Sequence, residues 1–222
     1  MYPNVLTEID AGVGIITLNR PERHNALDAE MVRDLNEVLA AMAANPAVRV
    51  LVLSSAGKTF SAGADLDWTG TVASQRVHED ESDGRGLAEA LQHLSSFAKP
   101  TIARVQGAAR GGGVGLIAAC DIAIATFDTS FALAEGSPSL VPDTIFPHVI
   151  GAMGERHAKR YLLTQERFSA AEAYRIGLLH EMVADEAALD QAVGQIVEDL
   201  LQSGPSTHTE FKERIRLIRR QR

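Results

Sequence analysis

The order of apolar and polar positions divides the chain into alternating strand-like and helix-like runs. The strand-like runs are short and rich in β-branched residues, and the runs at 48–53 and 101–105 are almost continuously apolar, as in parallel strands covered on both faces. A four-residue turn separates the first two runs, which predicts an amino-terminal hairpin. The predicted strands cover residues 5–9, 14–18, 48–53, 101–105, 122–126 and 130–134.

The helix-like runs repeat apolar side chains with a period of about 3.6 residues. Asp28 is a candidate N-cap for the first helix, and Ser169 with Glu172 forms a predicted capping box near the carboxyl end. Residues 67–85 are polar and acidic, so we expect a mobile, solvated loop there. The strands are followed by helices only, which predicts an α/β core with a helical carboxyl-terminal part. The predicted helices cover residues 28–44, 86–97, 154–163, 169–176 and 186–201.

A glycine-rich stretch, residues 107–121, joins two of the predicted strands and ends in an apolar run that suits a short helix. Glycine lets another group approach the main chain closely, and free N–H groups at a helix amino terminus favour negative charge. We therefore interpret the stretch as an anion-stabilising turn, with a tight packing turn as the alternative. Residues 113–118 also fit a dinucleotide pattern, but too few residues precede the next strand for a crossover helix of normal length.

Composition narrows the classes of function. A chain of 222 residues with 45% hydrophobic content can bury a sizeable core. The net charge of −8 argues against broad nucleic-acid binding. We see no standard signal peptide and no apolar stretch of membrane-spanning length, so we expect a cytoplasmic protein with no membrane partner. Cys120 is the single cysteine, which excludes an internal disulfide.

Basic residues gather in the last eleven positions. Phe211, Ile215 and Ile218 recur there at helical spacing and predict an amphipathic helix that packs on a neighbour. We expect its charges to form a solvated helix face rather than an anion site. Elsewhere, the acids of residues 78–83 lack the spacing of a calcium loop, and the histidines form no zinc motif. We therefore expect no metal site.

Short signatures recur through the chain in a fixed order, beside the predicted strand ends and loops. Together they resemble the enoyl-CoA hydratase/isomerase family, also called the crotonase family. The resemblance extends from about Val5 to about Val183 and keeps the order of every element. The signatures are Asn19-Arg20-Pro21, Asn25-Ala26-Leu27, Phe60 to Leu66, Lys99-Pro100, Gly107, Gly111 to Gly113, Cys120-Asp121, Phe131 and Glu135.

The resemblance implies a spiral of ββα units with a helical carboxyl-terminal region. The acyl-CoA-binding core would take residues 1–183, and a helical segment, shorter than in most members, would take residues 184–222. The family forms trimers that often pair into hexamers, so a homotrimer or a dimer of trimers is expected. The implied substrate is an acyl-CoA thioester, whose coenzyme A is part of the substrate, and no separate cofactor is expected.

The resemblance also assigns site residues. The backbone N–H groups of Ala64 and Gly112 would form an oxyanion hole for the thioester carbonyl. Glu135 would act as general acid and base, with Asp143 as a candidate second acid. The remaining candidates contact coenzyme A: main-chain groups of Ala62, Ala64, Asp65 and Leu66 beside the adenine, and the side chains of Arg20, Arg23 and Lys58 near the phosphates, with a solvated loop charge as the alternative for each basic residue.

One departure from the family bears on the reaction. Family hydratases use two glutamates, and Gly115 stands here in place of the first. Hydration requires a carboxylate that activates water and a proton delivered to the α-carbon. The sequence of residues 111–116 resembles that of a bacterial branch of methylglutaconyl-CoA hydratases, which also carries glycine at the position of Gly115. Monofunctional enoyl-CoA isomerases likewise use one carboxylate, and dienoyl-CoA isomerases place a second acid at the spacing of Asp143 from Glu135.

Three functions therefore stay open. The leading hypothesis is a hydratase-type lyase that adds water to an α,β-unsaturated acyl-CoA. The alternative within the family is an enoyl- or dienoyl-CoA double-bond isomerase that uses Glu135 with or without Asp143. The alternative of another class is a catalytically degenerate acyl-CoA-binding protein. Arg110, before the glycine triplet, could neutralise a substrate carboxylate, but we expect it to pair with an acid of this protein.

Overall fold

Two sheets organise the computed structural model, which describes residues 2–65, 81–133 and 143–220. The main sheet has the strand order β1-β2-β3-β4-β6-β9, and a small sheet has the order β5-β7-β8. In the main sheet β1 and β2 are antiparallel, and the other neighbours are parallel. The strands are β1 (Val5–Asp10), β2 (Val13–Leu18), β3 (Val50–Ser55), β4 (Thr101–Val105), β5 (Ala108–Arg110), β6 (Ile122–Thr126), β7 (Ser130–Ala132), β8 (Phe168–Ser169) and β9 (Glu181–Val183).

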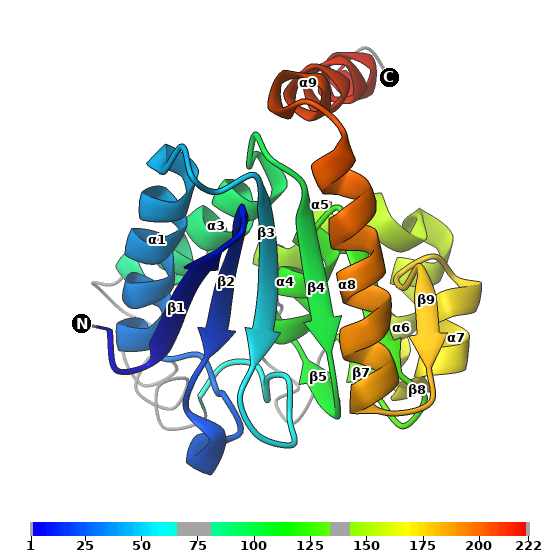
Figure 1. Ribbon diagram of the computed structural model, residues 1–222. Helices are drawn as coiled ribbons and strands as arrows, with labels where there is room; N and C mark the ends of the chain where they lie inside the picture. Colours follow the sequence, from blue (N-terminus) through cyan, green and yellow to red (C-terminus); the bar gives the residue numbers. More distant parts are fainter. Residues whose placement is uncertain (1, 66–80, 134–142, 221–222) are drawn as a thin grey trace.

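Helices cover the main sheet unequally. Figure 1 shows α1, α3 and α4 behind the sheet, α8 alone across its front, and α9 at the end of the body where α8 finishes. The α-helices are α1 (Ala29–Ala44), α3 (Glu81–Ser95), α4 (Gly112–Ala119), α5 (Phe146–Met153), α6 (Glu155–Thr164), α7 (Ala170–Arg175), α8 (Glu186–Gln202) and α9 (Pro205–Arg220), and the 3-10 helices are η1 (Pro21–Arg23) and η2 (Asp143–Ile145).

Strand β3 shows why both faces of the sheet are buried near its centre. Leu51 and Leu53 belong to the larger apolar core with α1, α3 and α4. Val50 and Val52 face the other way and join a smaller core with Leu189 and other residues of α8. Successive side chains of a strand point to opposite faces, so a continuous apolar run is needed where both faces are covered. The strand predicted at 48–53 from its almost continuously apolar run forms at 50–55, and all six of its residues are buried, as predicted.

Several local predictions are confirmed residue by residue. The hairpin forms between β1 and β2. The Asp28 carboxylate accepts a hydrogen bond of 2.8 Å from the Met31 amide and begins α1. Ser169 caps α7 by accepting a bond of 3.3 Å from the amide of Glu172. These caps follow from side-chain chemistry within four residues, so sequence reasoning reaches them.

Other predictions are wrong at element boundaries. Helix α3 begins at Glu81, so residues 81–85 of the predicted loop are helical; residues 66–80 lie outside the described part of the chain. The final third of the chain contains β8 and β9 as well as helices, and α5 was not predicted. Strand β9 has only three residues, and it forms because it pairs with β6. A run this short shows no periodic pattern in the sequence, so the sequence does not predict it. The division at residue 183 stays a prediction.

The glycine-rich stretch lies within a compact crossover between the parallel strands β4 and β6. The chain leaves β4, forms β5, and returns through α4, which has eight residues. The crossover is therefore shorter than a normal βαβ connection, in agreement with the rejection of a dinucleotide fold. It places the amino terminus of α4 beside the loop that follows β3.

Candidate active site

Two turns meet at the end of the main sheet, one after β3 and one after β4. Isolated β-bridges join Ser61 to Ala109 and Leu27 to Ala64. The amide of Ser61 donates to the Ala108 carbonyl over 3.1 Å, and the amide of Arg110 donates to the Ser61 carbonyl over 2.9 Å. The FSAGAD signature and the glycine triplet, which are far apart in sequence, are therefore joined by backbone hydrogen bonds.

Two glycines permit this approach. Gly107 has φ of +70°, and a Cβ there would lie 1.9 Å from the carbonyl oxygen of Lys58. Gly63 has φ of +81°, and a Cβ there would lie 2.9 Å from the carbonyl oxygen of Arg110. Any side chain at either position would force the backbones apart. The close approach at Gly107 supports the packing-turn interpretation of the glycine-rich stretch, and its anion-stabilising role stays a prediction.

The amides of Ala64 and Gly112 are available for a ligand. The bridge to Leu27 uses the Gly63 carbonyl and the Asp65 amide, at 2.7 and 3.0 Å, so the Ala64 N–H points away from it. Gly112 begins α4, whose N-cap, Gly111, has no side chain to cap it. Neither amide donates to another residue of the described ranges. Two open N–H groups, one at a helix amino terminus, can stabilise negative charge on an oxygen.

Leu27 packs against both turns. It forms the bridge with Ala64, and its Cδ1 atom would lie 2.8 Å from a Cβ on Gly112. Leu87 of α3 would lie 3.1 Å from the same Cβ. Position 112 therefore has apolar walls that a larger side chain would disturb. The sequence placed Leu27 in a signature but gave it no role.

Asn25 is a buried anchor that sequence reasoning missed. Its Oδ1 accepts from the Arg20 amide, and its Nδ2 donates to the carbonyls of Ala56 and Thr59, each over 2.8 Å. Its φ is +51°, a conformation that asparagine adopts more readily than most residues. The available signal was an Asn in a turn between a strand and a helix. Asn25 holds the loop after β2 against the loop after β3.

The basic candidates for the coenzyme A phosphates differ in their surroundings. Arg20 lies 2.7 Å from the Asp28 carboxylate, and its side chain is 15% exposed. The half-exposed guanidinium of Arg23 lies 3.5 Å from the Asp65 carboxylate. Lys58 is exposed and forms no ion pair within the described part of the chain. Arg20 is therefore engaged in an ion pair with Asp28, whereas the ammonium group of Lys58 has no carboxylate partner among the described residues.

The remaining predicted residues are placed as follows. Ala62 is exposed, and its amide donates to the His24 carbonyl over 2.9 Å. Asp143 begins η2 and is exposed. The Arg110 guanidinium donates to the Ser130 carbonyl over 2.6 Å. Leu66 and Glu135 lie outside the described residues.

The position of the missing family glutamate is closed. A Cβ on Gly115 would lie 2.6 Å from Cγ2 of Ile145 and 3.4 Å from Cδ1 of Leu91. Ile145, at the end of η2, is buried. An apolar side chain therefore fills the space into which a residue at 115 would grow. The packing around Gly115 therefore leaves no room for a carboxylate side chain at this position.

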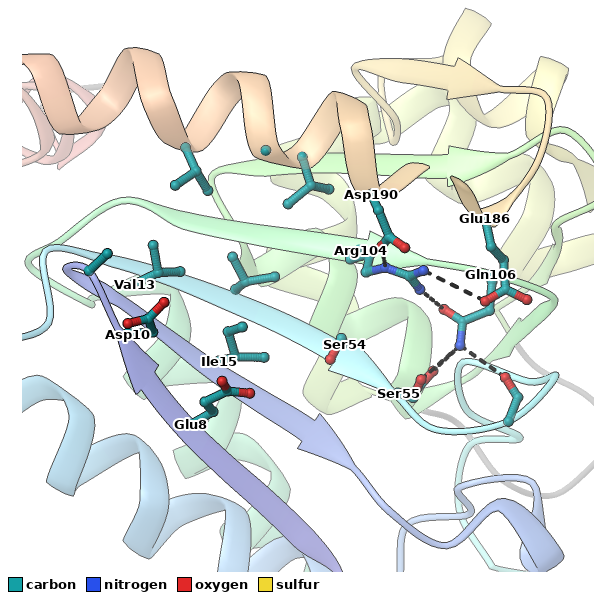
Figure 2. Close-up of a pocket in the computed structure, with 16 residues that line it drawn as sticks. Glu8, Asp10, Val13, Ile15, Ser54, Ser55, Arg104, Gln106, Glu186 and Asp190 are labelled. Carbon is teal, nitrogen blue, oxygen red and sulfur yellow. Dashed lines mark hydrogen bonds and ion pairs between the residues drawn. The ribbon is translucent and has the colours of Figure 1, made fainter. Parts of the chain in front are cut away.

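A separate open groove of about 590 Å³ lies between α8 and the front of the sheet (Figure 2). Its lining includes none of the predicted site residues that the structure describes. In it Arg104 contacts Asp190 at 2.6 Å and donates to Gln106 over 3.1 Å. Gln106 in turn donates to the carbonyls of Ser55 and Gly57 at 2.8 and 3.0 Å. Arg104 and Gln106, on the wall of this groove, thus hold the beginning of the loop after β3 from the side opposite α4.

Other chemistries find little support in the described ranges. No cluster of three or more His, Cys, Asp or Glu side chains could hold a metal ion there. Burial raises the pKa of the Cys120 thiol to about 12, which makes it a poor nucleophile. Every helix in the described ranges falls short of the length or apolarity needed to cross a bilayer.

Comparison with known proteins identifies the family. The enoyl-CoA hydratase/isomerase family model matches residues 8–219. A crystal structure of an enoyl-CoA hydratase from Shewanella pealeana matches with a TM-score of 0.91 and 38% identity, over 96% of this chain and 79% of that chain. The hydroxycinnamoyl-CoA hydratase-lyase of Pseudomonas fluorescens is 30% identical, over 92% of this chain and 75% of the relative.

A relative with another reaction is equally similar. The peroxisomal Δ(3,5)-Δ(2,4)-dienoyl-CoA isomerase of Arabidopsis thaliana is 32% identical, over 91% of this chain and 77% of the relative. Hydratases and isomerases therefore both occur among the relatives. The predicted crotonase fold is confirmed by the structural match, and the chain belongs to the enoyl-CoA hydratase/isomerase family.

Proposed function

We propose that this protein is a hydratase that adds water to an α,β-unsaturated acyl-CoA through a thioester enolate. The observation that carries the proposal is the pair of open N–H groups, Ala64 and Gly112, on adjoining turns. Donors preorganised at a developing oxyanion are each worth roughly 2.7–4 kcal/mol of transition-state stabilisation. Leu27 and Leu87 form apolar walls at position 112, which would limit the water that competes with the substrate for the Gly112 donor.

The proposed reaction moves electrons toward these donors. The thioester oxygen accepts hydrogen bonds from the two amides, which makes the β-carbon electrophilic. Water attacks the β-carbon, the double-bond electrons move to the carbonyl oxygen as an enolate, and one water proton passes to Glu135. Glu135 then returns a proton to the α-carbon as the thioester reforms, so that the net change is the addition of one water. The role of Glu135 rests on the family resemblance.

A specific observation favours isomerisation as the second candidate. Ile145 fills the space beside Gly115, so this side of α4 supplies no carboxylate for water. A double-bond shift needs only one group, which removes a proton from one carbon of the enolate precursor and returns it to another. Glu135 would do this alone, or with Asp143 on a dienoyl substrate. Both reactions use the same pair of amides.

Coenzyme A binding is assigned to the rim of the two turns. Lys58 and Arg23 are the basic groups best placed for phosphate contact, because they are the more exposed of the three candidates. Arg20, held by Asp28, would shape the loop instead. Main-chain groups from Ala62 to Leu66 would border the adenine. These contacts would be largely electrostatic at the phosphates and would weaken with salt.

We further propose that the protein assembles as a homotrimer through α9. The basic side chains of Lys212 and Arg216 hold α9 on the body, while its apolar side chains face solvent. Large apolar side chains that are exposed together on one helix are typical of an interface. Four large side chains, Phe211, Ile215, Leu217 and Ile218, are each 57–59% exposed.

The test uses the protein in deuterated water with crotonyl-CoA, 3-methylglutaconyl-CoA and a 3-enoyl-CoA in separate reactions. A hydratase yields a product heavier by one water with deuterium at the α-carbon, whereas an isomerase yields a shifted double bond without added water. Tight binding with no turnover of any substrate would instead identify a degenerate acyl-CoA-binding protein. Glu135→Gln, which keeps the size of the side chain, should retain binding and lose turnover.

A further inference from the structure

We propose that Ser61 is a positioning residue that fixes the distance and orientation between the two oxyanion amides. The proposal rests on the proposed function, because it concerns the geometry of Ala64 and Gly112. Ser61 touches neither the reacting atoms nor coenzyme A in this scheme. It acts through the two turns that carry the donors.

Each described polar group of Ser61 is bonded within the site. Its side chain is fully buried, with 0% exposure. Its amide and carbonyl bond Ala108 and Arg110 of the β5 turn, as described above. Its hydroxyl donates to the Asn25 carbonyl over 2.8 Å and accepts from the Gly63 amide over 3.2 Å. One residue therefore connects three loops.

The hydroxyl controls the peptide that contains the Ala64 N–H. The Gly63–Ala64 peptide is planar, and its carbonyl is held by the Leu27 amide at 2.7 Å. The preceding amide, that of Gly63, is held by Ser61 Oγ. Glycine at 63 has the widest backbone freedom of any residue, so these two bonds set the direction of the Ala64 N–H. Without Oγ, only one of them remains.

Ser61 also sets the position of α4. A Cβ on Gly113 would lie 2.8 Å from Cβ of Ser61 and 3.1 Å from its Oγ. The first turn of α4, which carries the Gly112 amide, therefore rests directly on this serine. Ser61 is the physical spacer between the two donors, with Ala64 three positions along the chain on one side and Gly112 one contact away on the other.

The inference predicts a defect in chemistry rather than in binding. Ser61→Ala leaves the Asn25 carbonyl and the Gly63 amide without their bonded partner, and this unfavourable state is relieved if the loop shifts. A shift of the Gly63–Ala64 peptide misaligns one donor. Misplacement of a catalytic group by about 1 Å lowers a rate by up to roughly 100-fold. We therefore expect kcat to fall about 10- to 100-fold while KM changes less than about threefold.

The matched control is Ser54→Ala. Ser54 is also a buried serine, 8% exposed, and its hydroxyl bonds the Ile16 carbonyl at 3.3 Å. It lies on β3, and within the described residues its hydroxyl bonds Thr17 and Ile16 and neither of the two turns. This variant loses a similar hydroxyl and should keep kcat within about twofold. Equal losses in both variants would overturn the proposal, because they would show a general effect on stability.

A spectroscopic measurement separates positioning from packing. Butyryl-CoA has no double bond to hydrate, so its thioester carbonyl stretch can be recorded by infrared difference spectroscopy while it is bound. Two aligned donors should shift this stretch to lower wavenumber in the unmodified protein and in Ser54→Ala. The shift should shrink in Ser61→Ala. An unchanged shift and kcat in Ser61→Ala would overturn the role of Ser61.

The outcomes also separate this proposal from the proposed function. No turnover and no carbonyl shift in the unmodified protein would reject the oxyanion site itself. A shift in the unmodified protein that Ser61→Ala retains would reject only Ser61. If Ser61→Ala fails to fold, Ser61→Cys keeps a group of similar size with a weaker donor. It should show an intermediate kcat and carbonyl shift, and full retention of both would count against the proposal.

Discussion

Helix α4 lies against the main sheet and helix α9 at the end of the body (Figure 1), and their apolar side chains have opposite surroundings. Helix α4 carries no charged residue, is almost entirely buried, and leaves backbone N–H groups open at its first turn. Helix α9 contacts the body through polar groups: Lys212 bonds the Lys99 carbonyl and Asp121, and Arg216 bonds the Ser95 and Phe97 carbonyls. Its large apolar side chains face solvent.

The comparison distinguishes a helix that is buried by its own chain, α4, from a helix whose apolar side chains are left exposed to solvent, α9. The environment of α4 is supplied by the chain itself, so its donors are held without help from another molecule. The apolar side chains exposed on α9 are unfavourable in water. Their burial against a partner would contribute about 25 cal/mol of favourable free energy for each Å² of apolar surface covered. We therefore expect substitutions near α4 to affect folding and rate, and those on α9 to affect assembly.

The largest effect should come from Gly107→Ala. The new Cβ would overlap the Lys58 carbonyl, and φ of +70° disfavours alanine, so we expect a loss of about 4 kcal/mol in the free energy of unfolding. Urea denaturation followed by circular dichroism measures it. Gly194→Ala, in α8 where nothing lies within 4 Å of the new Cβ, is the control and should be neutral or slightly stabilising. A stable Gly107→Ala variant would mean that the turns need not approach closely.

Gly115→Glu should have the next largest effect. The side chain would enter the space of Ile145, so we expect a loss of about 3 kcal/mol from overpacking and from burial of a carboxylate. The double variant Gly115→Glu with Ile145→Ala should regain part of the stability, and a thermal melt would show it. If the single variant is as stable as the unmodified chain, Ile145 does not close this position.

The site and the fold differ in how far the sequence predicts them. Asp28, Ser169 and the limits of β4 follow from chemistry local to a few residues, and the sequence predicts them correctly. For the glycine-rich stretch, residues 107–121, the sequence predicts an anion-stabilising turn with a packing turn as the alternative, and the anion role stays a prediction. The bonds of Asn25 to Thr59, Ser61 to Asn25 and Gln106 to Ser55 each join residues more than 30 positions apart, and no local pattern in the sequence predicts such contacts.

A smaller effect is expected from α9. Replacing Phe211 and Ile215 with serine removes two exposed apolar side chains, so the monomer should lose less than about 0.5 kcal/mol of stability. Self-association should weaken at least about tenfold, because these groups would lie at the interface. Light scattering after gel filtration measures the mass. Glu8→Gln, on β1 and away from α9, is the control; an unchanged mass for the serine variant would show that α9 does not mediate assembly.

The smallest effect concerns the junction between the two helices. Cys120 caps the end of α4 and precedes Asp121, which bonds Lys212 of α9. Burial raises the thiol pKa to about 12, so the reactive thiolate is scarce until the pH approaches that value. We expect alkylation at pH 8 to be roughly 1,000-fold slower than for a free cysteine. Arg216→Met removes the bonds of α9 to the Ser95 and Phe97 carbonyls and keeps Lys212, whose charge lowers the thiol pKa. It should accelerate alkylation by loosening α9, and an equal rate in both proteins would show that α9 does not protect the thiol.

The compact crossover around α4 also affects the order in which the strand pairs are expected to form during folding. The β4/β6 pair joins Ile102 to Ile122, whereas β3 pairs with β4 through Leu51 and Thr101, across a much longer loop. Closing a shorter loop costs less chain entropy, so strand pairs close in sequence tend to form before distant ones. We expect φ-values for Ala103 and Ala123 variants to exceed those for Leu51 variants. The turn that carries the Gly112 amide would then be shaped early in folding, before the loop after β3 docks against it.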